Sequence, residues 1–160
     1  MENIEILPSF NFGQFQFNVE QLNYRINKAW HIDTTRKENH SEYLMVFDSA
    51  LCLFRAMFLE KENKNYTYQN YFRSMGRQDI ADKIDNYLDN NAYSNGVSIR
   101  NALKFLSDKF VCHVDNVSEI NIATANYYMA TLHNPYAKFN MKEIMNELYA
   151  IMGAGERDRT

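Results

Sequence analysis

The strongest constraint on the fold is an apolar stripe whose members recur at alternating spacings of three and four residues. Its members are Leu44, Phe47, Leu51, Phe54 and Phe58. Because an α-helix turns once in 3.6 residues, this spacing places all five side chains on one helical face. Val46, Ala50 and Met57 widen the stripe. The sequence therefore predicts a helix over residues 40–58 that contacts neighbours on two sides, near the centre of a bundle.

Similar periodicity predicts helices elsewhere in the chain. The sequence has only 5 glycines and 2 prolines, too few turn-forming residues for a fold of many short strands. We expect one all-α domain over residues 1–160, an antiparallel helical bundle of about five to seven helices. The further predicted helices cover residues 18–31, 68–75, 80–88, 99–113, 119–133 and 141–151.

The two ends of the chain lack this pattern. Four phenylalanines near the N-terminus partly alternate with other residues, which predicts an extended aromatic arm over residues 1–17. This arm would cover either its own bundle or a second subunit. Gly153 is predicted to end the last helix, leaving residues 154–160 as a frayed tail. The four phenylalanines are Phe10, Phe12, Phe15 and Phe17.

Charge and cysteine content exclude several function classes. The net charge of −3 gives no whole-molecule basis for binding a phosphate backbone. Arg36, Lys37 and His40 form a local basic cluster that can contact phosphate, although a solvated connector explains it as well. Cys52 and Cys112 are not spaced as metal ligands, which favours a reducing compartment and the cytoplasm. No signal peptide, membrane span, cofactor motif or metal-ligand pattern is recognisable, so we expect no cofactor, no metal and no membrane.

The best candidate for chemistry lies near the end of the helix predicted over residues 99–113. Lys109 and His113 are four residues apart and share a helical face. His113 is the candidate general base, Lys109 the candidate phosphate contact and Asp108 an orienting carboxylate. In the alternative interpretation, His113 closes the apolar face of the helix and Lys109 is a solvated surface residue.

The heptapeptide from Ser107 to His113, Ser-Asp-Lys-Phe-Val-Cys-His, resembles the motif of the HEPN superfamily, particularly its abortive-infection and toxin-like members of prokaryotes. That motif, often written RDKxxAH, places an arginine a few residues before a histidine. Asp108, Lys109 and His113 align with it, and the order of the helices is similar over residues 39–133. The resemblance implies an antiparallel helical bundle that dimerises and brings two motifs together to cleave RNA without a metal.

The sequence departs from this motif at one position, because Ser107 occupies the place of the arginine. A hydroxyl cannot clamp a phosphate in two places as a guanidinium does. Arg100 lies about 20 Å from His113 along a helix, too far to join the same site except from another subunit. The departure favours a degenerate form of the family over an active ribonuclease.

Two functions therefore follow from the sequence. The first is a HEPN-like protein of a prokaryotic defence or toxin–antitoxin type, a divergent or degenerate metal-independent ribonuclease-like module. The alternative is a non-catalytic interaction, accessory or inhibitor protein that acts through its aromatic arm and bundle surface. The aromatic content of 14% suits both core packing and self-association. We expect a homodimer with a protein partner, while RNA has weaker support.

Overall fold

The structure, a computed structural model, describes residues 12–61, 66–108 and 119–158. These residues form α-helices and no β-strand, which confirms the predicted all-α bundle. Short 3₁₀ and π-helical turns, at Lys37–Asn39 and Arg55–Leu59, flank the second helix. The helices are α1 (Phe12–Trp30), α2 (His40–Phe54), α3 (Tyr68–Ser74), α4 (Gln78–Asn90), α5 (Ile99–Leu106), α6 (Glu119–His133) and α7 (Met141–Asp158).

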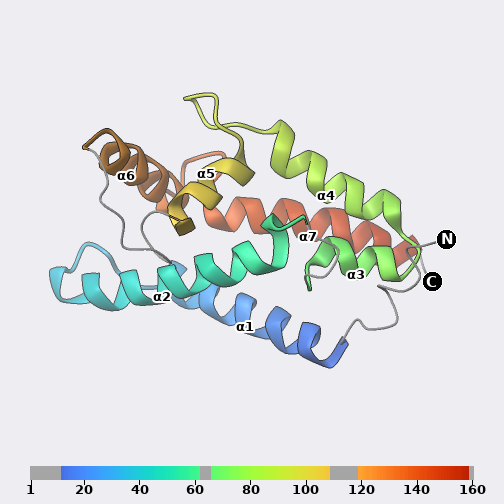
Figure 1. The fold of residues 1–160 in the computed structure, drawn as a ribbon. Coiled ribbons are helices and arrows are strands. Elements are labelled where there is room, and N and C mark those ends of the chain that lie inside the picture. The colour runs from blue at the N-terminus through green and yellow to red at the C-terminus, as the bar shows by residue number, and fades with distance from the viewer. Residues whose placement is uncertain (1–11, 62–65, 109–118, 159–160) are drawn as a thin grey trace.

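The helices are arranged around α7, which contacts α4, α1 and α6 (Figure 1). α1 and α2 run in opposite directions as a hairpin below α7, and α4 lies above it (Figure 1). α3 packs on α4, while the short α5 contacts α4, α6 and the π-helical turn after α2. The core is therefore built mainly from helices that follow one another in the chain.

The predicted central helix forms α2 and continues into the π-helical turn Arg55–Leu59. Phe47, Leu51, Phe54 and Phe58 are buried as expected, with at most 4% of each residue exposed. Leu44, the first member of the stripe, is instead 45% exposed. α2 packs on α1, the π-helical turn packs on α5, and Leu44 lines a hollow that it shares with Met129, Ala130 and His133 of α6.

The N-terminal prediction is wrong where it can be compared, because residues 12–17 form the first turns of α1 and not an extended arm. Phe15 stacks on Tyr71, with ring centroids 4.8 Å apart, and lies edge-on to Tyr68 at 5.1 Å. Phe12 also contacts Tyr71. Phe12 and Phe15 are three residues apart, and a helix places residues with this spacing on one face, where both contact α3. Residues 1–11, with Phe10, lie outside the described residues.

The C-terminal boundary is also wrong. The backbone of α7 stays helical through Gly153 to Asp158, whereas residues 154–160 were predicted to be frayed. A glycine inside a helix costs about 1 kcal/mol relative to alanine and need not end it. The glycines that do end helical or turn segments are Gly76 and Gly96, whose φ angles of 76° and 86° favour a residue without a Cβ.

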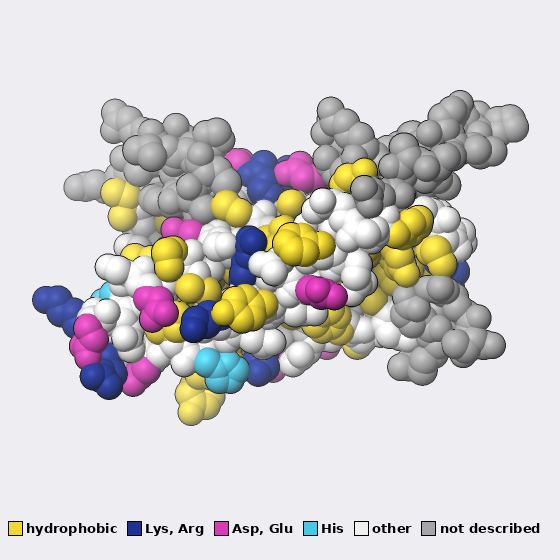
Figure 2. Space-filling view, turned by 90° about the horizontal axis from the view of Figure 1, so that it is seen from below, with side chains coloured by type: hydrophobic (Ala, Val, Ile, Leu, Met, Phe, Trp, Pro, Cys, Tyr) yellow, Lys and Arg dark blue, Asp and Glu magenta, His cyan; other side chains and the backbone are white. Residues whose placement is uncertain are grey.

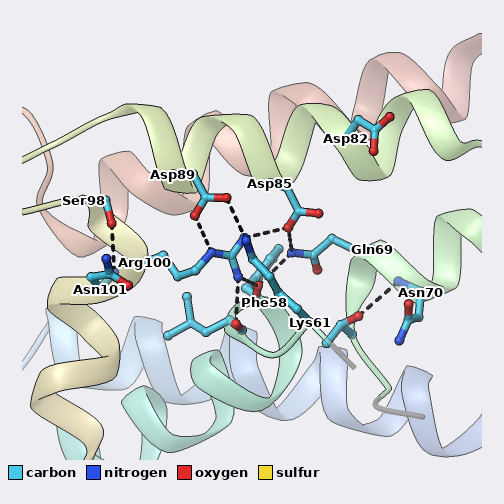
Figure 3. A network of polar contacts seen from close by, with 12 residues as sticks. Phe58, Lys61, Gln69, Asn70, Asp82, Asp85, Asp89, Ser98, Arg100 and Asn101 are labelled. Carbon is cyan, nitrogen blue, oxygen red and sulfur yellow. Dashed lines mark hydrogen bonds and ion pairs between the residues drawn. The ribbon is translucent and has the colours of Figure 1, made fainter. Parts of the chain in front are cut away.

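A buried arginine on α5 connects three elements of the bundle (Figure 3). The Nε and Nη2 atoms of Arg100 donate to Asp89 and Asp85 of α4, each at 2.6 Å. Its Nη1 donates to the backbone oxygen of Leu59 at 2.7 Å, at the end of the π-helical turn. The side chain of Arg100 is only 5% exposed. One guanidinium thus binds α4 and the last turn of the α2 segment to α5.

The neighbours of Arg100 complete this network (Figure 3). Gln69 of α3 donates through Nε2 to the Phe58 backbone oxygen at 2.7 Å and to Asp85 at 3.0 Å. Arg73 donates to the second oxygen of Asp85, and Lys61 donates to Asp89. Burial raises the pKa of Asp89, but the hydrogen bond and charge of Arg100 outweigh it, and the pKa falls below its ordinary value. Asp89 therefore stays ionised at neutral pH.

Removing the guanidinium should be strongly destabilising. Arg100→Ala leaves two carboxylates and the Leu59 backbone oxygen without their main donor, and we expect a loss of about 3–5 kcal/mol in the free energy of unfolding. Arg100→Lys keeps the charge but cannot bond in the same planar pattern, so its loss should be intermediate. Urea unfolding at pH 7 measures both. Lys83→Ala, on the exposed side of α4, is the matched control and should change stability by less than about 0.5 kcal/mol. Equal losses of stability in Arg100→Ala and Lys83→Ala would show that the hydrogen-bond network of Arg100 contributes little.

Candidate functional site

The structure describes only the beginning of the predicted catalytic heptapeptide. Lys109 and His113 lie outside the described residues, so their predicted pairing stays a prediction. Ser107 and Asp108 directly follow α5 and are described. The geometry of the candidate site is therefore built from these two residues and from the side chains that reach them.

Arg55, at the start of the π-helical turn, reaches both residues. Its Nη1 donates to Ser107 Oγ at 2.9 Å and also contacts Asp108 Oδ1. Its Nε donates to Glu60 Oε2 at 2.8 Å. Arg55 is therefore the partner of the C-terminal end of α5.

Ser107 is fully buried, and its hydroxyl makes two hydrogen bonds. Its hydroxyl accepts from Arg55 and donates to the backbone oxygen of Lys104 at 3.0 Å. The position that holds an arginine in the HEPN motif is thus part of the packing between α5 and α2. A hydroxyl bound in this way has no free donor for a substrate phosphate.

The described part of this site is negatively charged. Arg55 supplies one positive charge between the carboxylates of Glu60 and Asp108. Burial acts to lower the pKa of Arg55, but hydrogen bonds to Glu60 and Asp108 outweigh it and raise the pKa above its ordinary value. The guanidinium therefore stays charged and bound to carboxylates, which compete with any phosphate for it.

The importance of this ion-pair cluster can be measured directly. Arg55→Ala leaves Asp108 and Glu60 close together without a cation, and we expect a loss of about 1 kcal/mol in stability. Arg36→Ala is the control, because the Arg36–Glu38 pair is more than half exposed on both sides and should contribute less than about 0.5 kcal/mol. Urea unfolding compares the two, and equal losses would mean that Arg55 is no more than a surface charge.

Two members of the predicted basic cluster of Arg36, Lys37 and His40 have partners within the chain. Arg36 donates to Glu38 at 2.6 Å, and His40 Nε2 donates to the backbone oxygen of Thr34 at 2.9 Å. An open hollow of about 580 Å³ lies nearby, and its lining mixes both charges. The positive and negative charges in the lining of this hollow are therefore equal in number. The charged residues and histidine of its lining are Lys28, His31, Asp33, Arg36 and Glu42.

His133, the last residue of α6, has a more distinctive environment. Its ring lies edge-on to Tyr43 at 4.7 Å and to Trp30 at 5.7 Å, and its Nε2 is 3.4 Å from Thr34 Oγ1. Burial lowers the pKa of His133 below its ordinary value. With His40, it lines an apolar hollow of about 300 Å³ at the start of α2. His133 therefore forms part of the packing between α6, α1 and α2.

The lowered pKa of His133 makes stability depend on pH. The unfolded chain binds a proton near the ordinary pKa of about 6.5, whereas the folded chain resists it, so this contribution is present above that pH and is lost as the pH falls. We expect wild type to lose more stability between pH 7.5 and pH 5 than His133→Gln does. Urea unfolding at a series of pH values measures this difference. His31→Gln, at an exposed histidine, should keep the wild-type slope, and parallel curves for all three proteins would contradict the role of His133.

Sequence reasoning missed the contacts of Arg55 with Ser107 and Asp108 because these two residues lie more than fifty positions away in the chain. A signal existed: Arg55 is the only charged residue between Asp48 and Glu60, in an otherwise apolar stretch. A charge in such a stretch needs a partner or a path to water. Arg100 is bound to Asp85 and Asp89. His113 lies outside the described residues, so the predicted separation of Arg100 from it stays a prediction.

Comparisons with models of known protein families, with curated proteins and with solved structures gave no match. The described side chains contain no group of three or more His, Cys, Asp and Glu that could bind a metal ion. None of the helices in the described part of the chain has both the length and the apolar character needed to cross a bilayer.

Proposed function

We propose that this chain is a degenerate HEPN-like helical bundle of a prokaryotic defence or toxin–antitoxin type, which acts by binding protein and does not cleave RNA. The observation that supports the proposal is the engagement of Ser107 and Asp108 with Arg55. In an active site of this type a guanidinium must be available to a phosphate. Here the position of the motif arginine is a buried hydroxyl, and the nearby guanidinium is bound to carboxylates.

The charges around the candidate site and on the whole chain also favour a protein partner over RNA. Arg55, Glu60 and Asp108 together carry a net charge of −1, and a phosphodiester carries −1 as well. RNA binding relies on clustered cations that replace counterions along the backbone, and the whole chain is acidic. A protein partner fits this balance better than a nucleic acid does.

The catalytic alternative gives each residue a role that can be tested. His113 would act as general base, Lys109 would contact the phosphate, and Asp108 would orient them. Asp108 is ion-paired with Arg55, so its carboxylate is already committed to a structural partner. This contact favours the degenerate form over the catalytic one.

A cleavage assay distinguishes the two forms. Wild type and His113→Ala are incubated with single-stranded and hairpin RNA in EDTA, which excludes metal-dependent contaminants, and products are resolved on a denaturing gel. We expect no cleavage by either protein and no salt-dependent RNA retention in a filter-binding assay. Cleavage by wild type that disappears in His113→Ala would overturn the proposal and support the catalytic alternative. A metal-independent ribonuclease serves as the positive control.

A further inference from the structure

The apolar hollow between the start of α2 and the end of α6, which we call the α2/α6 hollow, has the size of a small-molecule site. Its volume of about 300 Å³ is at the lower end of the range for pockets that hold small ligands. Tyr43 and Leu44 of α2 form one wall, and Met129 and Ala130 of α6 form the other. The remaining residues of its lining are Thr34, His40 and His133. A molecule placed there would contact mainly hydrocarbon and aromatic surface.

The lining of the α2/α6 hollow offers no strong partner to an acidic ligand. Among the described residues, no Lys or Arg belongs to it. Burial lowers the pKa of His133 below its ordinary value, so its imidazole is neutral at neutral pH. On the side of the molecule where α1 and α2 lie, Lys and Arg side chains are separated by acidic and hydrophobic ones (Figure 2). A carboxylate or phosphate therefore finds no group of cations here.

One carboxylate, that of Asp48, lies beside the α2/α6 hollow. Asp48 follows Leu44 by four residues, so the two share a side of α2, with Cβ atoms about 5–6 Å apart. Helical side chains lean toward the N-terminus of their helix, which directs the carboxylate of Asp48 toward the turn of Leu44. Burial and, after it, the charge of Asp48 raise the pKa of Tyr43 to about 12. The carboxylate is therefore close to two residues of the lining.

Asp48 has no partner of opposite charge in the described part of the chain. It is partly buried, and burial raises its pKa above the ordinary value, with no hydrogen bond or cation to offset the shift. Arg55, two turns further along α2, is bound to Glu60 and Asp108. A partly buried carboxylate without a donor is unfavourable, and a cation placed beside it would offset that cost. The charge next to the α2/α6 hollow thus favours a cationic ligand.

We propose that the α2/α6 hollow binds a small organic amine, with the ammonium group against the carboxylate of Asp48 and the apolar body between α2 and α6. An aromatic body fits best, because the rings of Tyr43 and His133, whose centroids are 4.7 Å apart, offer edge and face contacts. The inference goes beyond the proposed function and does not depend on it, since amine binding is measured without RNA and without a protein partner.

Three probes of similar shape test the class of ligand: phenethylamine, phenethyl alcohol and phenylacetate. In calorimetric titrations at neutral pH, we expect wild type to bind phenethylamine with a Kd below about 10⁻³ M. The neutral alcohol should bind at least about tenfold more weakly, because it cannot form a charge-assisted hydrogen bond with Asp48. Phenylacetate should not bind measurably, because its charge repels that carboxylate.

Tryptophan fluorescence locates the bound amine. Trp30 is the only tryptophan of the chain, and its ring centroid lies 5.7 Å from that of His133, which lines the α2/α6 hollow. We therefore expect phenethylamine to change the emission of Trp30 with the same Kd as calorimetry gives. Heat of binding without any change in this emission would place the amine elsewhere and overturn the proposal.

Two variants separate the charge from the apolar walls. Asp48→Asn keeps the shape of the side chain, so it should weaken phenethylamine binding at least about tenfold and remove the preference over the alcohol. Its stability in urea should be unchanged or higher, because an unpaired charge is removed, and this excludes misfolding as the cause. Ala130→Leu fills the hollow from an exposed position of α6 and should abolish binding of both probes.

Ala123→Leu is the matched control, because Ala123 is also exposed on α6 but does not line the hollow. It should bind phenethylamine as wild type does. A wild type that does not bind phenethylamine at about 10⁻³ M, or that binds all three probes equally, would contradict the proposal. Undiminished amine binding by Asp48→Asn or by Ala130→Leu would overturn it as well.

Discussion

The bundle depends on one arginine. Arg100 satisfies the last backbone oxygens of the α2 segment and bonds two carboxylates of α4 with the same guanidinium. Helix ends leave backbone oxygens without partners, and burying them without donors would be costly. Because these oxygens belong to the π-helical turn, Arg100 allows that turn to end inside the protein. The orientation of α4 and α5 relative to α2 follows from this arrangement.

A second arginine completes the connection at the other end of α5. Arg55 at the beginning of the π-helical turn binds Ser107 and Asp108 after α5, while Leu59 at its end accepts from Arg100 near the beginning of α5. The short helix is therefore attached at both ends to one turn of its neighbour. Ser107 and Asp108, the two described residues of the heptapeptide that resembles the HEPN motif, are part of this attachment.

Much of the fold could be predicted from the sequence, because helical periodicity reports local geometry. The stripe from Phe47 to Phe58 is buried, as expected from its spacing. The N-terminal phenylalanines were misassigned because the contact between Phe15 and Tyr71 joins residues far apart in the chain. The partners of Arg55 and Arg100 were inaccessible for the same reason. Sequence periodicity gives the direction of a side chain around its own helix but not the neighbour that it meets.

The π-helical turn has a consequence for how this chain tolerates changes in length. A π-helical turn accommodates one residue more than the α-helix it interrupts, and one residue of an α-helix corresponds to a rotation of about 100°. Deleting any one residue within Arg55–Leu59 would restore a regular helix and turn its two ends relative to each other. α5 could then stay attached at one end only. The length of this turn is accordingly as important to the fold as the side chain of Arg55 at its start.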